Sequence, residues 1–366
     1  MRCLLALLLG TGFVFSTALA SAAEAPAKSA DAGKVAEAGI AFLRKAQGED
    51  GTWSPKTGTG VTSIVTTALL RNGVAASDPT VAKSLKYLAA QVRDDGGIYV
   101  AESTNKNYET CLAIICFKEA SGDGKYNKTI AAADKFIKGL QWDEGEQADK
   151  SDVNYGGAGY GRKNRPDMSN TSFLIEAIVA AGNGPEDENI QKALIFISRC
   201  QNLESEHNAT PFAAKINDGG FYYTVAAGGE TNVPEPDVNG GLRSYASMTY
   251  AGLKSMIHAG LKADDPRVKA AKTWITKHYD LNSNPGVGDM GLYYYYVTFA
   301  KTLHALGDKS FTDDKGVAHD WRAELTAALA SRQKPDGSWL NANARWMETD
   351  PNLVTAYALL ALSYAK

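Results

Sequence analysis

The feature of this sequence that most restricts its fold is a unit of two helix-like segments joined by a Gly-aromatic turn, which recurs six times. The first segment of each unit carries Lys, Glu and Arg between its apolar residues and usually ends in Gln. These segments read VAEAGIAFLRKAQ, VAKSLKYLAAQ, IAAADKFIKGLQ, IQKALIFISRCQ, VKAAKTWITKHY and RAELTAALASRQ. The pattern predicts six helices that each have one face in water.

A glycine-containing turn with an aromatic residue follows each of these segments, and a second helix-like segment comes next. The turns are DGTW at 50–53, DGGIY at 95–99, YGGAGY at 155–160, DGGFYY at 218–223, GLYYYY at 291–296 and DGSW at 336–339. The second segments are apolar, small or hydroxylic on nearly every side, which predicts helices covered all round. Most stop at a glycine suited to the left-handed position after a helix, namely Gly73, Gly122, Gly182, Gly260 and Gly307.

Six hairpins with one wetted and one covered helix each predict an outer ring of helices around an inner ring. No distinctly polar capping unit stands at either end, which favours a closed ring over an open superhelix. We therefore expect an all-α fold, an (α/α)6 toroid. In each unit the glycines permit the tight turn, the aromatic residue packs over the junction, and the Gln satisfies exposed backbone at the helix end.

The stretch QKPDGSWLN at 333–341 resembles the QW repeat of squalene and oxidosqualene cyclases and of protein prenyltransferase β-subunits. The segments DMSNTSFLIEAIVAAG and LVTAYALLALSYA look like the helix that follows this motif. The resemblance covers roughly residues 33–366 and implies a toroid with a central cavity. Because one fold serves many functions, the resemblance does not assign an activity.

The N-terminal 22 residues have the features of a secretory signal peptide, with a basic start, an apolar run and small-x-small cleavage sites. We expect a flexible leader at 23–32 and a single toroid domain at 33–366. No later stretch is apolar for long enough to predict a transmembrane segment, so the mature chain is expected to be exported to the periplasm or the exterior. A formal charge of −3 without a basic block argues against nucleic acid as a partner. The later cysteines, Cys111, Cys116 and Cys200, are expected to be small buried residues.

The catalytic motifs of the resembling families are missing. The Asp-x-Asp-Asp acid of class II terpene cyclases and the DDxxD sequence of class I synthases do not occur. The Asp-x-Cys and later His of the prenyltransferase zinc site are also missing. The stretch DEGEQ at 143–147 is similar to the thioester sequence of complement-like toroids, but Glu144 stands where the thiol is required. We therefore expect no metal and no cofactor.

Two loops between first and second segments are long, at 142–168 and 202–243, and insertions gathered on one rim indicate a binding face. Asp167 and Asp237 are the candidate catalytic residues in these loops, and we expect both near one mouth. The alternative for Asp167 is a cap on the next helix, and the alternative for Asp237 is stabilisation of its own loop. Asp350, which precedes a proline, is interpreted as a helix cap.

Aromatic residues near the turns form the second set of candidates, because rings that line a cavity stabilise cations and stack on flat or apolar ligands. Most of them are expected to be packing residues of the repeat. In the run from Tyr293 to Tyr296, helical geometry lets at most two rings face a cavity. The candidate ligand-binding residues are Tyr160, Tyr222, Tyr223, Tyr294, Trp339 and Trp346.

These observations leave two hypotheses for function. The first is a binding module that takes a small molecule, a glycan or a polypeptide at the loop-rich rim and central cavity. The alternative is an enzyme that uses a carboxylic acid as general acid in an aromatic-lined cavity, acting on an isoprenoid or a carbohydrate. A cyclase for a large polyene would be expected to carry a second helical domain and a membrane-docking insert. This length contains neither, which favours the binding module.

Overall fold

The computed structural model describes residues 31–162, 164–237, 239–307 and 310–366. The expected signal peptide at 1–22 and nearly all of the expected leader at 23–32 lie outside the described residues. Among the described residues, no helix combines the length and the apolar character needed to cross a bilayer.

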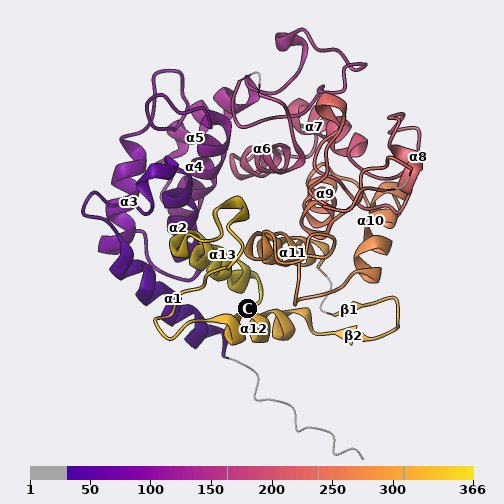
Figure 1. The fold of residues 1–366 in the computed structure, drawn as a ribbon. Coiled ribbons are helices and arrows are strands. Elements are labelled where there is room, and N and C mark those ends of the chain that lie inside the picture. The colour runs from indigo at the N-terminus through magenta and orange to yellow at the C-terminus, as the bar shows by residue number, and fades with distance from the viewer. Residues whose placement is uncertain (1–30, 163, 238, 308–309) are drawn as a thin grey trace, which may run out of the picture.

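Two concentric rings of helices form the body of the molecule, which confirms the expected all-α toroid (Figure 1). The outer ring consists of α1 (Ala32–Ala46), α3 (Pro79–Ala89), α5 (Asn127–Lys138), α7 (Glu188–Arg199), α10 (Pro266–Lys277) and α12 (Trp321–Arg332). The inner ring consists of α2 (Gly60–Arg71), α4 (Lys106–Ala120), α6 (Met168–Ala180), α9 (Ala246–His258), α11 (Leu292–Leu306) and α13 (Pro351–Tyr364). The remaining elements are the short helix α8 (Ala213–Ile216), four 3-10 turns, and a hairpin of β1 (Phe311–Thr312) and β2 (Ala318–His319) in which Phe311 pairs with His319.

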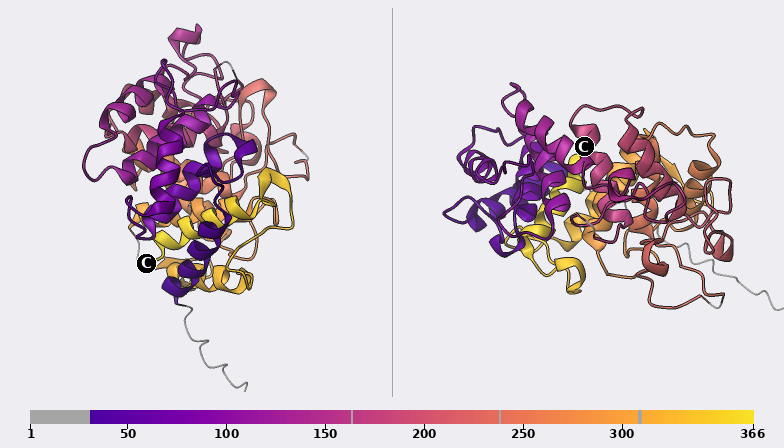
Figure 2. Two further views of the ribbon diagram at one scale, coloured as in Figure 1. Left: turned by 90° about the vertical axis from the view of Figure 1, so that its left-hand side faces the viewer. Right: turned by 90° about the horizontal axis from the view of Figure 1, so that it is seen from above.

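The ring is closed. Each inner helix packs on the next one along the chain, and α13 packs on both α2 and α1. The views of Figure 2 show this meeting of the last and first units. The absence of a polar capping unit in the sequence is explained by this closure, because the two end units cover each other.

The Gln at the end of an outer helix links neighbouring units. The side-chain amide of Gln333 donates to the carbonyl of Gly337 in its own turn (3.0 Å) and to that of Val35 in the first turn of α1 (2.9 Å). Gln47 makes the same pair of bonds to Gly51 and Thr80. Gln141 and Gln201 repeat the arrangement. The expected role of the Gln in satisfying backbone is confirmed in these four units, and in each the bond also reaches the next outer helix.

The turn glycine lets the backbone approach the next outer helix closely. Gly337 has a φ of +88°, and a Cβ added there would stand 2.3 Å from the carbonyl oxygen of Ala38 in α1. Trp339, two residues after Gly337 in the same turn, donates its backbone N–H to the hydroxyl of Thr355 in α13 (3.1 Å). Trp53 makes the same bond to Thr62 in α2. Both bonds fix the start of an inner helix against its turn.

Two details of the expected elements are wrong. The residues at 291–296 were expected to form a turn, but α11 begins at Leu292, and the turn lies before Gly291, which has a φ of +63°. Gly122 was expected to end α4 in the left-handed region, but the chain turns instead at Gly124, with a φ of +77°. The other four expected stops, at Gly73, Gly182, Gly260 and Gly307, have positive φ.

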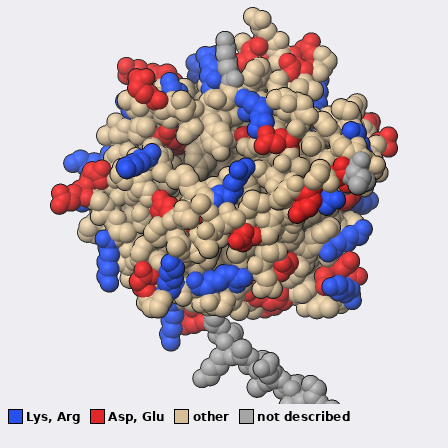
Figure 3. All heavy atoms as spheres, in the orientation of Figure 1, with Lys and Arg blue, Asp and Glu red and all other residues tan. Residues whose placement is uncertain are grey.

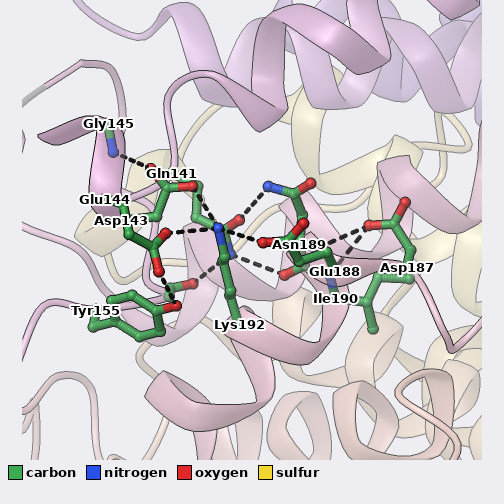
Figure 4. A network of polar contacts seen from close by, with 11 residues as sticks. Gln141, Asp143, Glu144, Gly145, Tyr155, Asp187, Glu188, Asn189, Ile190 and Lys192 are labelled. Atoms are coloured by element: carbon green, nitrogen blue, oxygen red, sulfur yellow. Dashed lines mark hydrogen bonds and ion pairs between the residues drawn. The ribbon is translucent and has the colours of Figure 1, made fainter. Parts of the chain in front are cut away.

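The long loops 142–168 and 202–243 lie side by side, as expected. The backbone N–H of Met168 donates to the carbonyl of Tyr223 (2.9 Å), and the hydroxyl of Thr224 donates to the carbonyl of Pro166 (2.8 Å). Outside the ring, Lys192 of α7 anchors the first loop through ion pairs with Asp143 (3.0 Å) and Glu144 (2.8 Å). Figure 4 shows this network, in which Tyr155 also bonds to Glu144.

The cysteines at 111, 116 and 200 are buried and free, which confirms their interpretation as packing residues. Burial raises the pKa of the Cys116 thiol to about 12, so this thiol stays protonated at neutral pH.

Candidate functional site

A cavity of about 450 Å³ occupies the centre of the ring. The face drawn in Figure 3 is hollowed near its centre, where few charged side chains are exposed. Every inner helix contributes to the cavity wall from its N-terminal half, through Val61, Tyr108, Phe173, Met248, Tyr294 and Tyr357. The cavity therefore depends on closure of the whole ring and is not the property of one repeat.

Aromatic rings from the inner helices form a continuous belt in the wall of this cavity. The ring of Phe173 lies edge-on to Tyr108, with centroids 5.4 Å apart, and 6.3 Å from the ring of Tyr294. The ring of Tyr294 lies 6.1 Å from that of Tyr357. These distances are in the range in which aromatic rings attract one another, so the belt is a packed wall. The hydroxyl of Tyr294 is held by the hydroxyl of Ser169 at 3.1 Å.

Another part of the cavity wall comes from the loops. Tyr160, Tyr223 and Trp346 line it, and the Tyr160 side chain is 41% exposed. The hydroxyl of Tyr245 accepts a bond from the side-chain amide of Asn232 (2.9 Å), which fixes its ring on this wall. Lys56 is the one charged residue among the described residues that line the cavity.

Asp167 lies behind the wall rather than on it. Its carboxylate caps α6, with one oxygen accepting from the Asn170 backbone N–H (2.9 Å) and the other from the Asn170 side-chain amide (2.8 Å). Burial raises the pKa of this carboxyl to about 6, although the bonds from Asn170 act in the opposite direction. The Tyr223 hydroxyl also bonds to it, and Tyr223 lines the cavity.

Asp237 does not meet Asp167 at the cavity. Its carboxylate accepts from the backbone N–H of Asn239 (2.9 Å) and lies 3.8 Å from the Arg243 guanidinium, within its own loop. Neither acid is among the residues that line the cavity, although Tyr223 of the second loop is, so the expectation that the two acids lie near one mouth stays a prediction. Asp350 caps α13 by accepting from the backbone N–H of Asn352 (2.9 Å), as expected.

The structure brings four of the six aromatic candidates to the cavity, namely Tyr160, Tyr223, Tyr294 and Trp346. Tyr222 and Trp339 are instead fully buried in the packing between the rings. The Tyr222 hydroxyl donates to the carbonyl of Arg199 (2.6 Å), and the Trp339 indole N–H donates to the carbonyl of Leu329 (2.8 Å). Both occupy the packing position of the repeat, over the end of their own outer helix.

Four aromatic residues that the sequence did not single out also line the cavity, namely Tyr108, Phe173, Tyr245 and Tyr357. The expected candidates lay at or near the turns, whereas these four lie at the start or in the first two turns of inner helices. A usable signal was present: a Tyr or Phe within a helix of otherwise small and aliphatic residues, as in LVTAYALLALSYA.

Glu348 supports the site from behind. Its carboxylate accepts from the backbone N–H groups of Tyr293 (3.0 Å) and Tyr294 (2.8 Å) at the start of α11 and from the Asn341 side-chain amide (2.7 Å). Burial raises the pKa of Glu348 to about 7. No group of three or more His, Cys, Asp or Glu side chains lies together in a metal-binding arrangement among the described residues.

Residues 57–226 match the family model of the squalene-hopene cyclase C-terminal domain. No curated protein matches the chain in sequence. Among solved structures, the type II terpene cyclase MstE from Scytonema, in complex with geranylgeranyl dihydroxybenzoate as substrate, has a TM-score of 0.55. It is 12% identical, over 91% of this chain and 97% of that chain.

Two further structures are similar over the same region. A protein from Actinoplanes has a TM-score of 0.54 at 14% identity, over 92% of this chain and 99% of that chain. An unsaturated glucuronyl hydrolase specific for heparin also has a TM-score of 0.54, at 11% identity, over 91% of this chain and 96% of that chain. At such low identities these likenesses show a shared α/α-toroid fold and leave the activity open.

Proposed function

We propose that this α/α toroid, which is similar to the squalene-hopene cyclase C-terminal domain over residues 57–226, binds a small, largely apolar molecule in its central cavity. The observation that carries the proposal is the cavity wall. Six tyrosines, one phenylalanine and one tryptophan line about 450 Å³, and none of the described lining residues is a carboxylate. A cavity of this size and composition is typical of a site for a small organic ligand.

The chemistry of the wall favours a ligand with flat or unsaturated parts. Aromatic faces attract rings and polyenes by stacking and dispersion, and the tyrosine hydroxyls add polar contacts at the ring edges. The Ser169 and Tyr294 hydroxyls already bond to each other, so this part of the wall does not need a hydrogen bond from the ligand.

Binding is favoured over catalysis because the nearest acid is engaged elsewhere. Both oxygens of Asp167 accept bonds from Asn170, and these bonds hold the helix start. A general acid must reach the atom that it protonates within hydrogen-bond distance or through one relay. In this site Asp167 is not a lining residue, and it bonds to the hydroxyl of Tyr223, which is one.

The same contact supports the second candidate, an enzyme in which Asp167 supplies a proton through Tyr223. A carboxyl with a pKa of about 6 keeps a sizeable protonated fraction near neutral pH. The similar structures include terpene cyclases and carbohydrate-active enzymes, so either substrate class suits this candidate.

We further propose that the mature chain acts outside the cytoplasm. This proposal rests on the basic start, apolar run and small-x-small sites of residues 1–22. Expression of the full chain followed by N-terminal sequencing of the exported protein tests it, and a product that keeps Met1 inside the cell would contradict it.

The binding proposal is tested with N-phenyl-1-naphthylamine, a neutral apolar probe whose fluorescence rises on leaving water. We expect saturable binding to the purified protein, and a loss of affinity of at least about tenfold in Val61→Trp, which fills the cavity. The matched control is Val317→Trp on the exposed β-hairpin, where the valine is 50% exposed. Equal affinity in both variants would overturn the proposal.

The enzyme candidate is tested with geranylgeraniol, followed by mass spectrometry. We expect it to be recovered unchanged. A cyclised product that disappears in Asp167→Asn but persists in Asp237→Asn would establish the enzyme instead, because the second acid lies away from the cavity.

A further inference from the structure

A second, much smaller chamber lies on the ring axis directly next to the aromatic cavity. It measures about 30 Å³ and is lined by all six inner helices, with its charged residues on their C-terminal halves. Phe173, Tyr294 and Tyr357 line both spaces, so only the aromatic belt separates them. A space of this size holds about one or two water-sized particles.

Charged side chains meet in this chamber. One oxygen of the Glu176 carboxylate (α6) contacts the ammonium of Lys254 (α9), and the other lies 2.7 Å from the ammonium of Lys301 (α11). The three side chains are 11%, 4% and 13% exposed. Arg71 of α2 also lines the chamber and pairs with Glu119 of α4 at 2.6 Å.

The charges do not balance. Three cations, Arg71, Lys254 and Lys301, face two carboxylates, Glu176 and Glu119, which leaves one positive charge in excess. Neighbouring groups do not correct this excess. Burial and the two lysines lower the pKa of His258 to about 4, so it stays neutral, and the ring of Tyr364 packs on the Arg71 guanidinium and on the ring of His304.

An excess buried charge is costly unless something neutralises it. One remedy is loss of a proton: burial lowers the pKa of Lys254 well below its usual value and that of Lys301 to about 7. The other remedy is an anion in the enclosed space between the lysines, where Ser172 also presents a hydroxyl. The lysines come from two different helices and converge on one carboxylate, and the space beside them is large enough for a halide ion or one carboxylate group.

We propose that this basic chamber, formed by Arg71, Glu176, Lys254 and Lys301, binds one small monovalent anion. The anion is either a free halide ion or the carboxylate head of the molecule whose apolar body fills the aromatic cavity. The second source rests on the proposed function, whereas the first does not. In the second case the ligand is an apolar organic acid, and its head enters past the rings of Phe173, Tyr294 and Tyr357.

The first experiment measures thermal unfolding while chloride replaces gluconate at constant ionic strength, together with the ³⁵Cl NMR line width. We expect Tm to rise with chloride and the chloride line to broaden. Both effects should vanish in Lys301→Met and persist in the control Lys45→Met, whose lysine is exposed on α1. A chloride response that is the same in both variants, or absent from the wild type, would overturn the proposal.

Glu176→Gln keeps the proposal testable if Lys301→Met does not fold. This change raises the excess from one positive charge to two, so chloride should bind more tightly and raise Tm more steeply than in the wild type. A merely structural role for the cluster predicts destabilisation without any change in chloride response. A folded Glu176→Gln protein that has lost its chloride response would also contradict the anion site.

The source of the anion is distinguished with 1-pyrenebutyrate and 1-pyrenebutanol, which share one apolar body. If the acid head is the occupant, the butyrate binds at least about tenfold more tightly, narrows the ³⁵Cl line, and loses its advantage in Lys301→Met. If a free halide is the occupant, both probes bind equally and the chloride line stays broad. A chloride response without any binding of N-phenyl-1-naphthylamine would leave the anion site standing and remove only the proposed function.

Discussion

At each of four junctions in this ring, the side-chain amide of one glutamine links two neighbouring units by hydrogen bonds. It donates two hydrogen bonds, one to a carbonyl of its own turn and one to a carbonyl in the first turn of the next outer helix. The bond from Gln333 to Val35 joins the last unit to the first. The Gln of the QW motif therefore acts on ring geometry rather than on chemistry.

Gln333→Ala tests this role. The change deletes both hydrogen bonds, to the turn and to α1, and we expect the free energy of unfolding to fall by about 1–3 kcal/mol in urea titrations. The matched control is Gln91→Ala. Gln91 stands at the equivalent place in the second unit, but its side-chain oxygen accepts a bond from Arg93 instead of bridging two units. A loss of unfolding free energy in Gln91→Ala as large as that in Gln333→Ala would contradict the linking role of Gln333.

Asp350 and Asp237, neither of which lines the cavity, give a second test at the scale of single residues. Asp350→Ala removes the cap of α13, and we expect a loss of about 1 kcal/mol with unchanged binding of N-phenyl-1-naphthylamine. Asp237→Asn keeps an acceptor for the Asn239 N–H, so stability should stay within about 0.5 kcal/mol, also with unchanged binding. Reduced probe binding in Asp237→Asn would show that the part of the second loop around Asp237 also acts on the cavity, as Tyr223 of the same loop does.

Two neighbouring tyrosines show why the sequence alone does not give the direction of every side chain. Tyr222 and Tyr223 are equally aromatic and equally close to the turn, yet one packs over α7 and the other lines the cavity. The direction of each side chain is set by the backbone of the loop, which depends on contacts such as that of Tyr223 with Met168. Those contacts join segments far apart in the sequence and leave no local pattern.

At the scale of elements, the N-termini of the inner helices meet around the cavity, and buried acids cap several of them. The Asp167 carboxylate caps α6, and Glu348 accepts from the first N–H groups of α11. Helix N-termini favour negative charge, whereas burial disfavours it. Burial dominates here, since it raises the pKa of both carboxyls, to about 6 and about 7.

These raised pKa values predict the direction of a pH effect. Between pH 4.5 and about 7 the folded protein keeps a proton on Glu348 that the unfolded chain has released, so the free energy of unfolding should fall as pH rises through this window. Each unit of pKa separation corresponds to about 1.4 kcal/mol. Glu348→Gln should therefore make the stability, measured by urea unfolding, less dependent on pH in this window.

The control for this effect is Glu144→Gln. Glu144 is exposed on the outer loop, and its bond with Lys192 lowers its pKa to about 2, so it stays ionised throughout the window. Its replacement should leave the slope of stability against pH unchanged. If the Glu348→Gln protein keeps the slope of the wild type, Glu348 is not the group that titrates.

The elements themselves were predicted well wherever the repeat is regular. Apolar periodicity and terminal glycines are local signals, and they located twelve helices and the order of the two rings. The fifth unit departed from the prediction because its outer segment ends in Tyr279 instead of Gln and its tyrosine run continues the helix. The strands β1 and β2, two residues each, are too short to leave a period in the sequence.

At the scale of the whole molecule, closure creates both central spaces. The aromatic cavity and the basic chamber are each lined by all or nearly all of the inner helices, so neither exists in an isolated repeat. The toroid was predictable because six units without a polar cap must cover one another. The lysine–glutamate cluster was not, because Glu176, Lys254 and Lys301 lie on three helices and no spacing in the sequence relates them.

Closure also predicts how the molecule unfolds. An open array of repeats loses its end units first, whereas a ring has no ends, and its units should unfold together. Leu359 in α13 is fully buried against Gly39 of α1 at the closing junction, and Leu174 is fully buried in α6. Leu359→Ala and Leu174→Ala should each cost about 2–5 kcal/mol. In both variants hydrogen exchange in α1 and in α7 should speed up by the same factor, because opening is global. If Leu359→Ala accelerates exchange in α1 and α13 while α7 keeps the rate of the wild type, the ring opens at its junction and the units are energetically independent.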